Sequence, residues 1–516
     1  MEQWCTRRIC LQNQNSQKNY GRKGRHPSLG TEGLLKLRYI NVLKFEKSHN
    51  NIDHLLMKNN LAYIFMLAVT LTSCNGFLDI KPDDKTIPET PEDFSAIIHE
   101  MCDEIEREQT STVGARAAME AAGVYLMACW CDNFETNLTE YPTGVMLPTY
   151  IGTYCSSGSM YKSCYSTIGR CNIIIDNLKT DLDTQEAKDV IGTAYAIRGI
   201  CYYQLLRYYC PPVGSEDEQL GVPLVTEFNM EAKPLRSTIP QTVARAEEDM
   251  KKALEYDIQN EYYFFTDDVI KGYLARLYFW SKRYDEAREM ALDVLQRHPL
   301  IEGEEYQKMM EAYDGMAGNM LFRVVKLDKS FASRNIYLSA RPISARFIKL
   351  FKEGDADIRY SLFIGRKRKN KKIFFSGLRS AELALIAMES AYHMGDTKTA
   401  LQLLNDLRKH RIKDCADYTM ATLPAVDAAD IIKVDAEGKA LTPLIYAILS
   451  ERRKELFLEG DRFTELKRNG RPEMWVMSKG LKYTTYKFMY TFAIPASDIQ
   501  LNPALRQNPG YTEIEY

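Results

Sequence analysis

Apolar residues three and four positions apart recur through most of the chain. This spacing places apolar side chains on one face of a helix, whereas a half-buried strand needs strict alternation. In 187–209, for example, Ala194, Ile197, Cys201 and Leu205 share one face. The other predicted helices are 116–129, 242–256, 269–282, 285–298, 378–394, 397–410 and 443–458. Strand-like runs are few and short, such as 320–325 and 372–375. The sequence therefore predicts a mainly α fold.

Two pairs of these helices resemble tetratricopeptide units. The pairs are 269–282 with 285–298, and 378–394 with 397–410. Each has a small residue on its second helix, Ala287 or Ala400, which lets two helices cross closely. These alanines are 113 residues apart, which is not a multiple of the roughly 34-residue repeat. We therefore expect helical hairpins around 187–299 and 378–410, separated by a loop-rich insertion at about 300–377. Generic helical hairpins are the alternative interpretation.

The apolar run 61–71 decides where the mature protein is expected to begin. It follows a short basic stretch and has eleven residues, too few for a bilayer core that needs about 20. The pattern is typical of a signal peptide, here 57–73. The sequence Leu71-Thr72-Ser73-Cys74 also fits a bacterial lipoprotein box, which predicts a lipid on the Cys74 sulfur. The alternative is an apolar helix within a longer domain.

The residues on either side of this signal divide the chain further. Residues 1–56 carry ten basic and four acidic side chains and no sustained periodicity. We interpret them as a misannotated upstream extension, with translation starting at Met57. Residues 74–91 contain three prolines and are expected to form a lipid-anchored tether. The remainder, 92–516, is expected to be a single domain.

Charge and motifs exclude several function classes. The chain has 67 basic and 69 acidic residues, so nucleic acid is not an expected partner. It has no HExxH, GxSxG, Walker or GxGxxG motif, and no catalytic residue, metal site or cofactor is predicted. A glycosidase that uses two carboxylates stays open as a less favoured alternative, because an acidic chain offers many such pairs.

Cysteines are numerous but form no metal-binding pattern. Nine of the twelve lie after Cys74, and an odd number cannot pair completely within one chain. In an exported protein, Cys155–Cys164 and Cys201–Cys210 are candidate disulfides. Those within helical patterns, such as Cys171, are expected to serve as small apolar residues. No pair of CxxC motifs indicates structural zinc.

Several segments together resemble the SusD/RagB family of nutrient-binding outer-membrane lipoproteins. The Cys-x-x-Phe-Leu-Asp start, the Tyr-rich helix with Gly-Val-Pro-Leu after it, the Arg-x-Ala-Glu helix start, the Glu-Arg-Arg…Glu-Gly-x-Arg signature and the Asn-Pro-Gly terminus occur in the expected order. They lie at 74–82, 202–224, 379–383, 450–463 and 494–511. Asp461 and Thr464-Glu465 depart from the usual pattern. The resemblance implies a SusD-like fold with a C-terminal signature region, 443–516.

Membership of this family would imply binding rather than catalysis. Such proteins lie on the outer face of the outer membrane, attached by lipid alone. They capture glycans, or peptides in some relatives, and cover a SusC-like TonB-dependent transporter. We therefore expect a glycan-binding subunit of an uptake complex, with a peptide-binding relative as the alternative. A surface glycoside hydrolase is less favoured.

The Glu-Arg signature predicts a buried structural network. Its members are Glu451, Arg452, Glu455, Glu459 and Arg462. Carboxylates four residues apart repel unless each meets a cation. Arg452 is one turn from Glu455, and Arg462 one turn from Glu459, so these pairs are expected. Gly460 suits a left-handed helix end. Acid–base work by two of these carboxylates is the minor alternative.

Aromatic side chains near polar ones are the expected sugar contacts, because flat rings pack against the CH-rich faces of sugars. The candidate ligand residues are Trp130, Asp132, Asn133, Tyr141, Tyr150 and Tyr154. Trp130 shares a helical face with Leu126, so a core position is its alternative. Trp280 is expected in the core, and the environment of Trp475 is left open. Tyr337 and Arg341 are weaker candidates, and 366–372 is expected to be a solvated basic loop.

Overall fold

The computed structural model of the protein describes residues 88–106, 114–119, 127–128, 130–135, 151–153, 155, 158–229, 231–312, 315–324, 342–478 and 481–511. The expected signal peptide, Cys74 and nearly all of the tether lie outside these residues. All described residues belong to one compact unit, Ile87–Tyr516. No helix among them is both long enough and apolar enough to cross a membrane.

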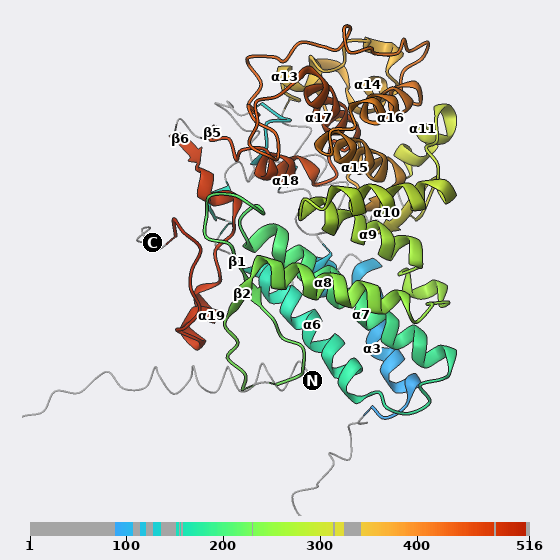
Figure 1. Cartoon of the computed structure of the whole chain (residues 1–516), viewed down its shortest axis with the longest axis vertical. Helices are drawn as coiled ribbons and strands as arrows, with labels where there is room; N and C mark the ends of the chain where they lie inside the picture. The colour runs from blue at the N-terminus through green and yellow to red at the C-terminus, as the bar shows by residue number, and fades with distance from the viewer. Residues whose placement is uncertain are drawn as a thin grey trace, which may run out of the picture. The chain divides into compact units, whose positions relative to one another are not determined.

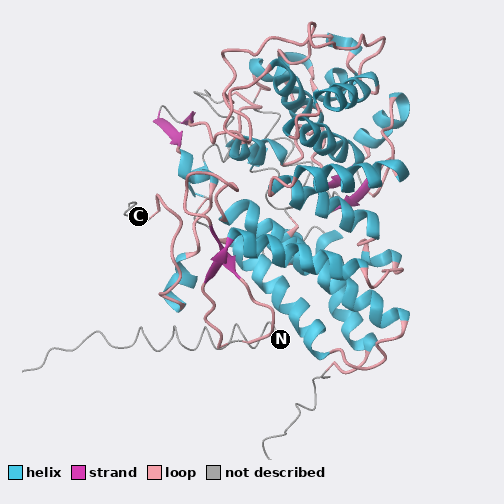
Figure 2. Cartoon of the chain, in the orientation of Figure 1, coloured by secondary structure: helices cyan, strands magenta, loops and turns pink. Residues whose placement is uncertain are grey.

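Helices dominate the described residues, which confirms the mainly α prediction (Figures 1 and 2). Those before residue 300 are α3 (Pro91–Glu106), α4 (Ala115–Ala118), α6 (Ser159–Asn177), α7 (Gln185–Tyr209), α8 (Ile239–Leu254), α9 (Asp267–Trp280) and α10 (Tyr284–Arg297). Those after it are α11 (Gly303–Glu311), α13 (Ala345–Ile348), α14 (Ile358–Phe363), α15 (Ser380–His393), α16 (Thr397–Lys409), α17 (Pro443–Glu455), α18 (Asp461–Arg468) and α19 (Ala496–Leu501). Short 3-10 turns are η2 (Ile151–Thr153), η3 (Glu261–Tyr263), η4 (Gly354–Ala356), η5 (Arg366–Arg368) and η6 (Lys487–Tyr490).

Strands in the described residues form three separate antiparallel pairs. They are β1 (Leu220–Pro223) with β2 (Arg236–Thr238), β3 (Met320–Arg323) with β4 (Gly377–Arg379), and β5 (Met474–Ser478) with β6 (Leu481–Thr485). The strand expected at 320–325 is present as β3, but the one expected at 372–375 is wrong. There the Lys372 ammonium donates to the carbonyl of Phe457 at 2.6 Å, and the Phe375 amide donates to that of Leu458. These residues therefore pack on the end of α17 instead of beside β3.

Capping residues fix where two of these helices begin. Thr238 caps α8, and its hydroxyl and the Gln241 side chain form a reciprocal capping box. Thr442 caps α17 and is followed by Pro443 at the first helical position. The start expected at 242 is therefore three residues late for α8, whereas the start expected at 443 agrees with α17.

The helical hairpins pack directly on one another. α9 packs against α10, α15 against α16, and α10 also packs against α15 (Figure 1). Ala287 and Ala291 of α10 and Ala400 of α16 are fully buried at these crossings. The chain between α10 and α15 therefore leaves the helical stack and returns to it. α7 lies among α3, α6 and α8, and most of its side chains are buried.

The eight cysteines within the described residues are free thiols. The candidate disulfides Cys155–Cys164 and Cys201–Cys210 are therefore absent, and that prediction is wrong. All four of these residues are buried, and burial raises the pKa of the Cys210 thiol to about 11. Such protonated, buried thiols act as small apolar side chains and are poorly reactive.

Candidate functional site

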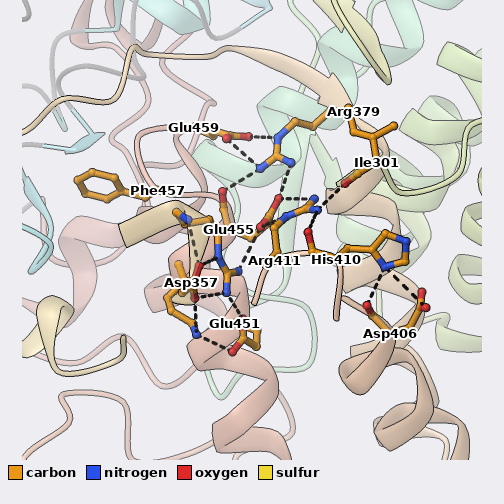
Figure 3. A network of polar contacts seen from close by, with 12 residues as sticks. Ile301, Asp357, Arg379, Asp406, His410, Arg411, Glu451, Glu455, Phe457 and Glu459 are labelled. Carbon is orange, nitrogen blue, oxygen red and sulfur yellow. Dashed lines mark hydrogen bonds and ion pairs between the residues drawn. The ribbon is translucent and has the colours of Figure 1, made fainter. Parts of the chain in front are cut away.

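Three carboxylates follow one another at intervals of four residues along the signature helix α17. Glu451 and Glu455 lie in its last two turns, and Glu459 lies just beyond its end. Glu455 lies at the centre (Figure 3). Its carboxylate accepts hydrogen bonds from Arg379 at 2.7 Å, from Arg411 at 3.0 Å and from Arg359 at 3.1 Å. All four side chains are completely buried. One carboxylate thus joins three elements far apart in sequence.

The two neighbouring carboxylates extend this network. Glu451 pairs with Arg359 and Lys454, each at 2.7 Å. Glu459 accepts from Arg379 at 2.8 Å and also pairs with Lys372. The expected solvation of 366–372 is therefore wrong at Lys372, which is buried against Glu459. Each of the three carboxylates is met by at least two cations, which removes the repulsion expected between them.

The protonation of these groups argues against acid–base work. Burial by itself raises the pKa of Glu455, but Arg411, Arg379 and Arg359 hold that pKa well below its usual range. The pKa of Glu451 is also lowered, because Lys454 and Arg359 outweigh burial. A general acid or base needs a pKa near the operating pH and access to substrate. Glu451 and Glu455 have neither, so the network is built to hold elements together.

Arg452 and Arg462 have other partners than those expected from their spacing. Arg452 donates to Asp461 at 2.5 and 2.9 Å. Arg462 donates to Asp132 at 2.8 and 3.1 Å and to Glu465 at 2.8 Å. The expected pairs of these arginines with Glu455 and Glu459 are therefore wrong. Glu455 and Glu459 pair with cations from distant elements, and Arg452 and Arg462 therefore contact other parts of the fold.

Gly460 marks the change of direction between α17 and α18. Its φ is 79°, in the left-handed region that glycine adopts without strain. This turn places the α18 side chains, including Arg462, against the segment that contains Asp132.

The segment 130–135 is held inside the molecule. Trp130, Asp132 and Asn133 are all 5% exposed or less. Arg453 donates to the Asn133 side chain at 2.7 Å and pairs with Asp132 at 2.9 Å. Burial raises the pKa of Asp132, but Arg453 and Arg462 hold it well below its usual value. In this structure these predicted ligand residues face protein partners, and their contact with a ligand stays a prediction.

The other candidates, Tyr141, Tyr150, Tyr154, Tyr337 and Arg341, lie outside the described residues. The described residues nearest to them are informative, however. Phe134 and Ile343 form an antiparallel bridge, and the Glu135 amide donates to the carbonyl of Pro342 at 2.9 Å. The described segments 134–135 and 342–343 are therefore paired with each other.

Exposed aromatic residues gather on the β5–β6 hairpin. Trp475 is 38% exposed and Tyr486 47% exposed. Trp475 pairs with Thr484 across the strands, and the Lys482 ammonium lies 5.4 Å from its ring centre. The Tyr486 ring stacks on Phe488, with centres 6.1 Å apart and an interplanar angle of 7°. By contrast, Trp280 is 5% exposed and belongs to the core, as predicted.

The periodicity of the sequence did not identify the hairpin or the cations of the network. Arg359, Arg379 and Arg411 lie 44 to 96 residues before Glu455. The sequence pointed to the network only through its carboxylates four residues apart. That spacing shows that cations are needed but not which residues supply them. No cluster of three or more metal-binding side chains occurs in the described part of the chain.

Two family models match the chain. One, described as starch-binding and associating with the outer membrane, matches residues 76–279. The other, described as the SusD family, matches residues 360–511. Together they cover more than half of the chain. A search of curated proteins found no match.

Solved structures share the fold at low sequence identity. A SusD superfamily protein from Bacteroides thetaiotaomicron is 21% identical, with a TM-score of 0.61 over 81% of this chain and 100% of that one. A SusD-like carbohydrate-binding protein from Bacteroides vulgatus is 18% identical, with a TM-score of 0.60 over 81% and 98%. A laminarin-binding SusD-like protein is 14% identical, with a TM-score of 0.54 over 82% and 99%. With both family models and this shared helical architecture, the chain belongs to the SusD/RagB family.

Proposed function

We propose that the protein binds a glycan at the cell surface and delivers it to a SusC-like TonB-dependent transporter of the outer membrane. The observation that carries this proposal is the family match, whose description combines starch binding with the outer membrane. Attachment would be through a lipid on Cys74, since Leu71-Thr72-Ser73-Cys74 has the form of a lipoprotein box. The domain would then face the cell exterior.

The ligand site is proposed where residues 136–150 leave the paired backbone at 134–135 and 342–343. Tyr141, Tyr150 and Tyr154 would supply rings for stacking on sugar faces. Trp130, Asp132 and Asn133 would form the base of the site, because their buried contacts fix the backbone from which this segment starts. A fixed base reduces the ordering cost of binding.

The exposed rings of Trp475 and Tyr486 supply a second surface with the same chemistry. Exposed aromatic side chains lose little conformational freedom when a flat ligand stacks on them. Thr484 and Lys482 on the same face can hydrogen-bond to sugar hydroxyls. We propose this face as an additional glycan contact.

Binding without hydrolysis is the favoured form of the function. SusD-like proteins are binding proteins, and Glu455 at the centre of the α17 network is buried and held ionised by arginines. A glycosidase needs one carboxylic acid with a raised pKa beside the scissile bond. A peptide-binding role is the alternative, and the ligand panel below distinguishes it.

The test is calorimetric titration of the purified full chain with laminarin, starch and pectin fragments and with a mixed peptide digest. We expect a glycan to bind and to remain uncleaved. Replacing Tyr141, Tyr150 and Tyr154 by alanine should weaken binding at least about tenfold, since loss of buried aromatic anchors typically removes more than about 1 kcal/mol each. The control is Tyr262→Ala, because Tyr262 is 76% exposed and lies on η3.

Each other outcome has a definite meaning. Binding of peptides but no glycan would favour the peptide-binding alternative. Release of sugar fragments would contradict the binding-only role. Unchanged affinity of the triple tyrosine variant would contradict the proposed site while leaving glycan binding intact.

A further inference from the structure

A cavity of about 280 Å³ lies beside α17, between the segment 346–353, which includes part of α13, and the loop 418–430. Arg346, Lys349 and Lys352 line it from the first segment, and Asp427 and Asp430 from the second. Its volume is just below the roughly 300–1,000 Å³ of ordinary small-molecule sites. It can therefore hold one end of a chain-like ligand, and it lies apart from the β5–β6 aromatic face.

Most charges on the floor of this cavity already have partners. They are Glu353 with Arg408 at 3.0 Å, Glu451 with Lys454 at 2.7 Å, and Arg453 with Asp132 at 2.9 Å. These pairs cancel one another and leave the floor nearly neutral. The net charge of the cavity is consequently determined by the remaining charged side chains of its lining.

Three cations remain without a partner. Within the described structure, the side chains of Arg346, Lys349 and Lys352 form no ion pair or hydrogen bond, and all three are exposed. Asp430 also lines the cavity, and its carboxylate accepts the Ile432 amide at 3.0 Å. The Asp427 carboxylate accepts the Ala429 amide at 2.8 Å. Within the described residues, three positive charges thus share the cavity with two carboxylates that form no ion pair, which leaves an excess of one positive charge.

The rest of the lining suits a ring-shaped ligand with hydroxyl groups. Tyr418 and Tyr446 both line the cavity. One face of Tyr418 is covered by the Arg408 guanidinium, 3.5 Å from the ring centre, so this ring is held in place. Asp427 can accept hydrogen bonds from sugar hydroxyls. A neutral sugar would contact these groups but would supply no negative charge to the three cations.

We propose that this cavity binds the anionic end of an acidic glycan. A sugar carboxylate or sulfate would face Arg346, Lys349 and Lys352, and a hydroxyl of the same residue would donate to Asp427. A concave surface with excess positive charge also raises the local concentration of anions and their rate of association. This inference rests on the proposed glycan-binding function and specifies its substrate class.

The experiment compares three glycan probes and an oligoglutamate peptide on the full chain by calorimetry at low and moderate salt. Oligogalacturonate carries carboxylates, carrageenan oligosaccharides carry sulfates, and laminarin oligosaccharides carry no charge. The test variant is R346Q/K349Q/K352Q. The matched control is K162Q/K233Q/K398Q, which removes the same charge from three exposed lysines that also lack partners and lie outside the cavity.

We expect one anionic probe to bind at least about tenfold more tightly than laminarin, with affinity falling as salt increases. The test variant should lose roughly tenfold for that probe, since each exposed ion pair contributes a factor of up to about five. Its affinity for laminarin and the behaviour of the control should be unchanged. The probe that binds identifies the anion as carboxylate or sulfate.

Three results would overturn the inference. Laminarin could bind as tightly as both anionic probes, or the test variant could bind the anionic probe as the wild type does. Tighter binding of an oligoglutamate peptide than of either anionic glycan would assign the cavity to acidic peptides. Failure of both anionic glycans to bind would also overturn the inference, whereas the proposed function falls only if starch, laminarin and pectin fragments all fail to bind.

Discussion

Glu465 of α18 is a buried carboxylate that shares its cation. Arg462 donates to Glu465 at 2.8 Å but is also bound twice by Asp132. Burial raises the pKa of Glu465 to about 7, because the divided charge of Arg462 compensates only part of the lost hydration. The Asp132 pKa moves the opposite way, since two arginines face it. Two carboxylates on one arginine are thus driven apart in pKa.

Replacing Glu465 by glutamine tests this assignment. A pKa of about 7 in the folded protein, above about 4.3 in the unfolded chain, means that the folded state holds the proton more tightly. Stability from this group is present at low pH and is lost as the pH rises through about 7. Wild type and E465Q should therefore melt together at about pH 4 and below, and E465Q should melt several degrees higher at pH 8. Melting curves across this range check it, and a difference that stays constant with pH would contradict a raised pKa.

At the same scale, the sequence predicted the need for charge compensation but not the partners. Glutamates at 451, 455 and 459 repeat at the spacing that brings like charges together. Their cations come from elements whose positions depend on the whole fold. Local spacing favoured Arg452 and Arg462 as the ion-pair partners. In the folded protein, tertiary packing instead places Arg359, Arg379 and Arg411 against the glutamates.

At the scale of elements, helices with a strong apolar stripe were predictable. The expected helix 397–410 corresponds to α16, Thr397–Lys409, and 443–458 begins at the same residue as α17. The error at 372–375 has a physical origin, because a buried lysine and two phenylalanines also satisfy the composition of a short strand. Which neighbour such a segment pairs with is a long-range property.

Close packing of α7 and α8 leads to a prediction about Gly199. A methyl group there would lie 2.9 Å from the Ala246 carbonyl oxygen and 3.1 Å from the Met250 amide nitrogen. These are backbone atoms, so the helices would have to separate. Although alanine gains about 1 kcal/mol of helix propensity over glycine, we expect G199A to lower the free energy of unfolding by about 1–3 kcal/mol. Urea denaturation measures this change.

Gly169 of α6 provides the matched control. It also lies within a helix, but an added methyl group would meet nothing within 4 Å. G169A should therefore be neutral or stabilising by up to about 1 kcal/mol. Equal effects of the two substitutions would show that helix propensity, not the crossing with α8, determines the result.

At the scale of the whole molecule, the return of the chain to the helical stack could not be read from the sequence. α10 and α15 pack together although β3, α11, α13 and α14 lie between them in sequence. The spacing of Ala287 and Ala400 indicated that an insertion separates the two helical hairpins. It did not indicate that the hairpins pack against each other. Periodicity reports on a helix and its immediate neighbour, whereas the joining of distant hairpins depends on buried contacts across the domain.

The last prediction concerns the complex in which the whole molecule would work. A glycan held at the cell surface enters the cell only if a pore receives it. A tether of residues 74–91 could reach at most about 60 Å when extended, enough for a domain anchored at Cys74 to sit over a barrel. We expect a TonB-dependent barrel to co-purify in mild detergent at near one-to-one stoichiometry, through an interface above about 1,200 Å².

Cys74→Ala should release the protein from washed membranes when the barrel is absent, because the lipid alone then holds it. Recovery without any barrel from cells grown on the bound glycan would contradict delivery, and membrane retention of the C74A variant without the barrel would contradict the lipid anchor.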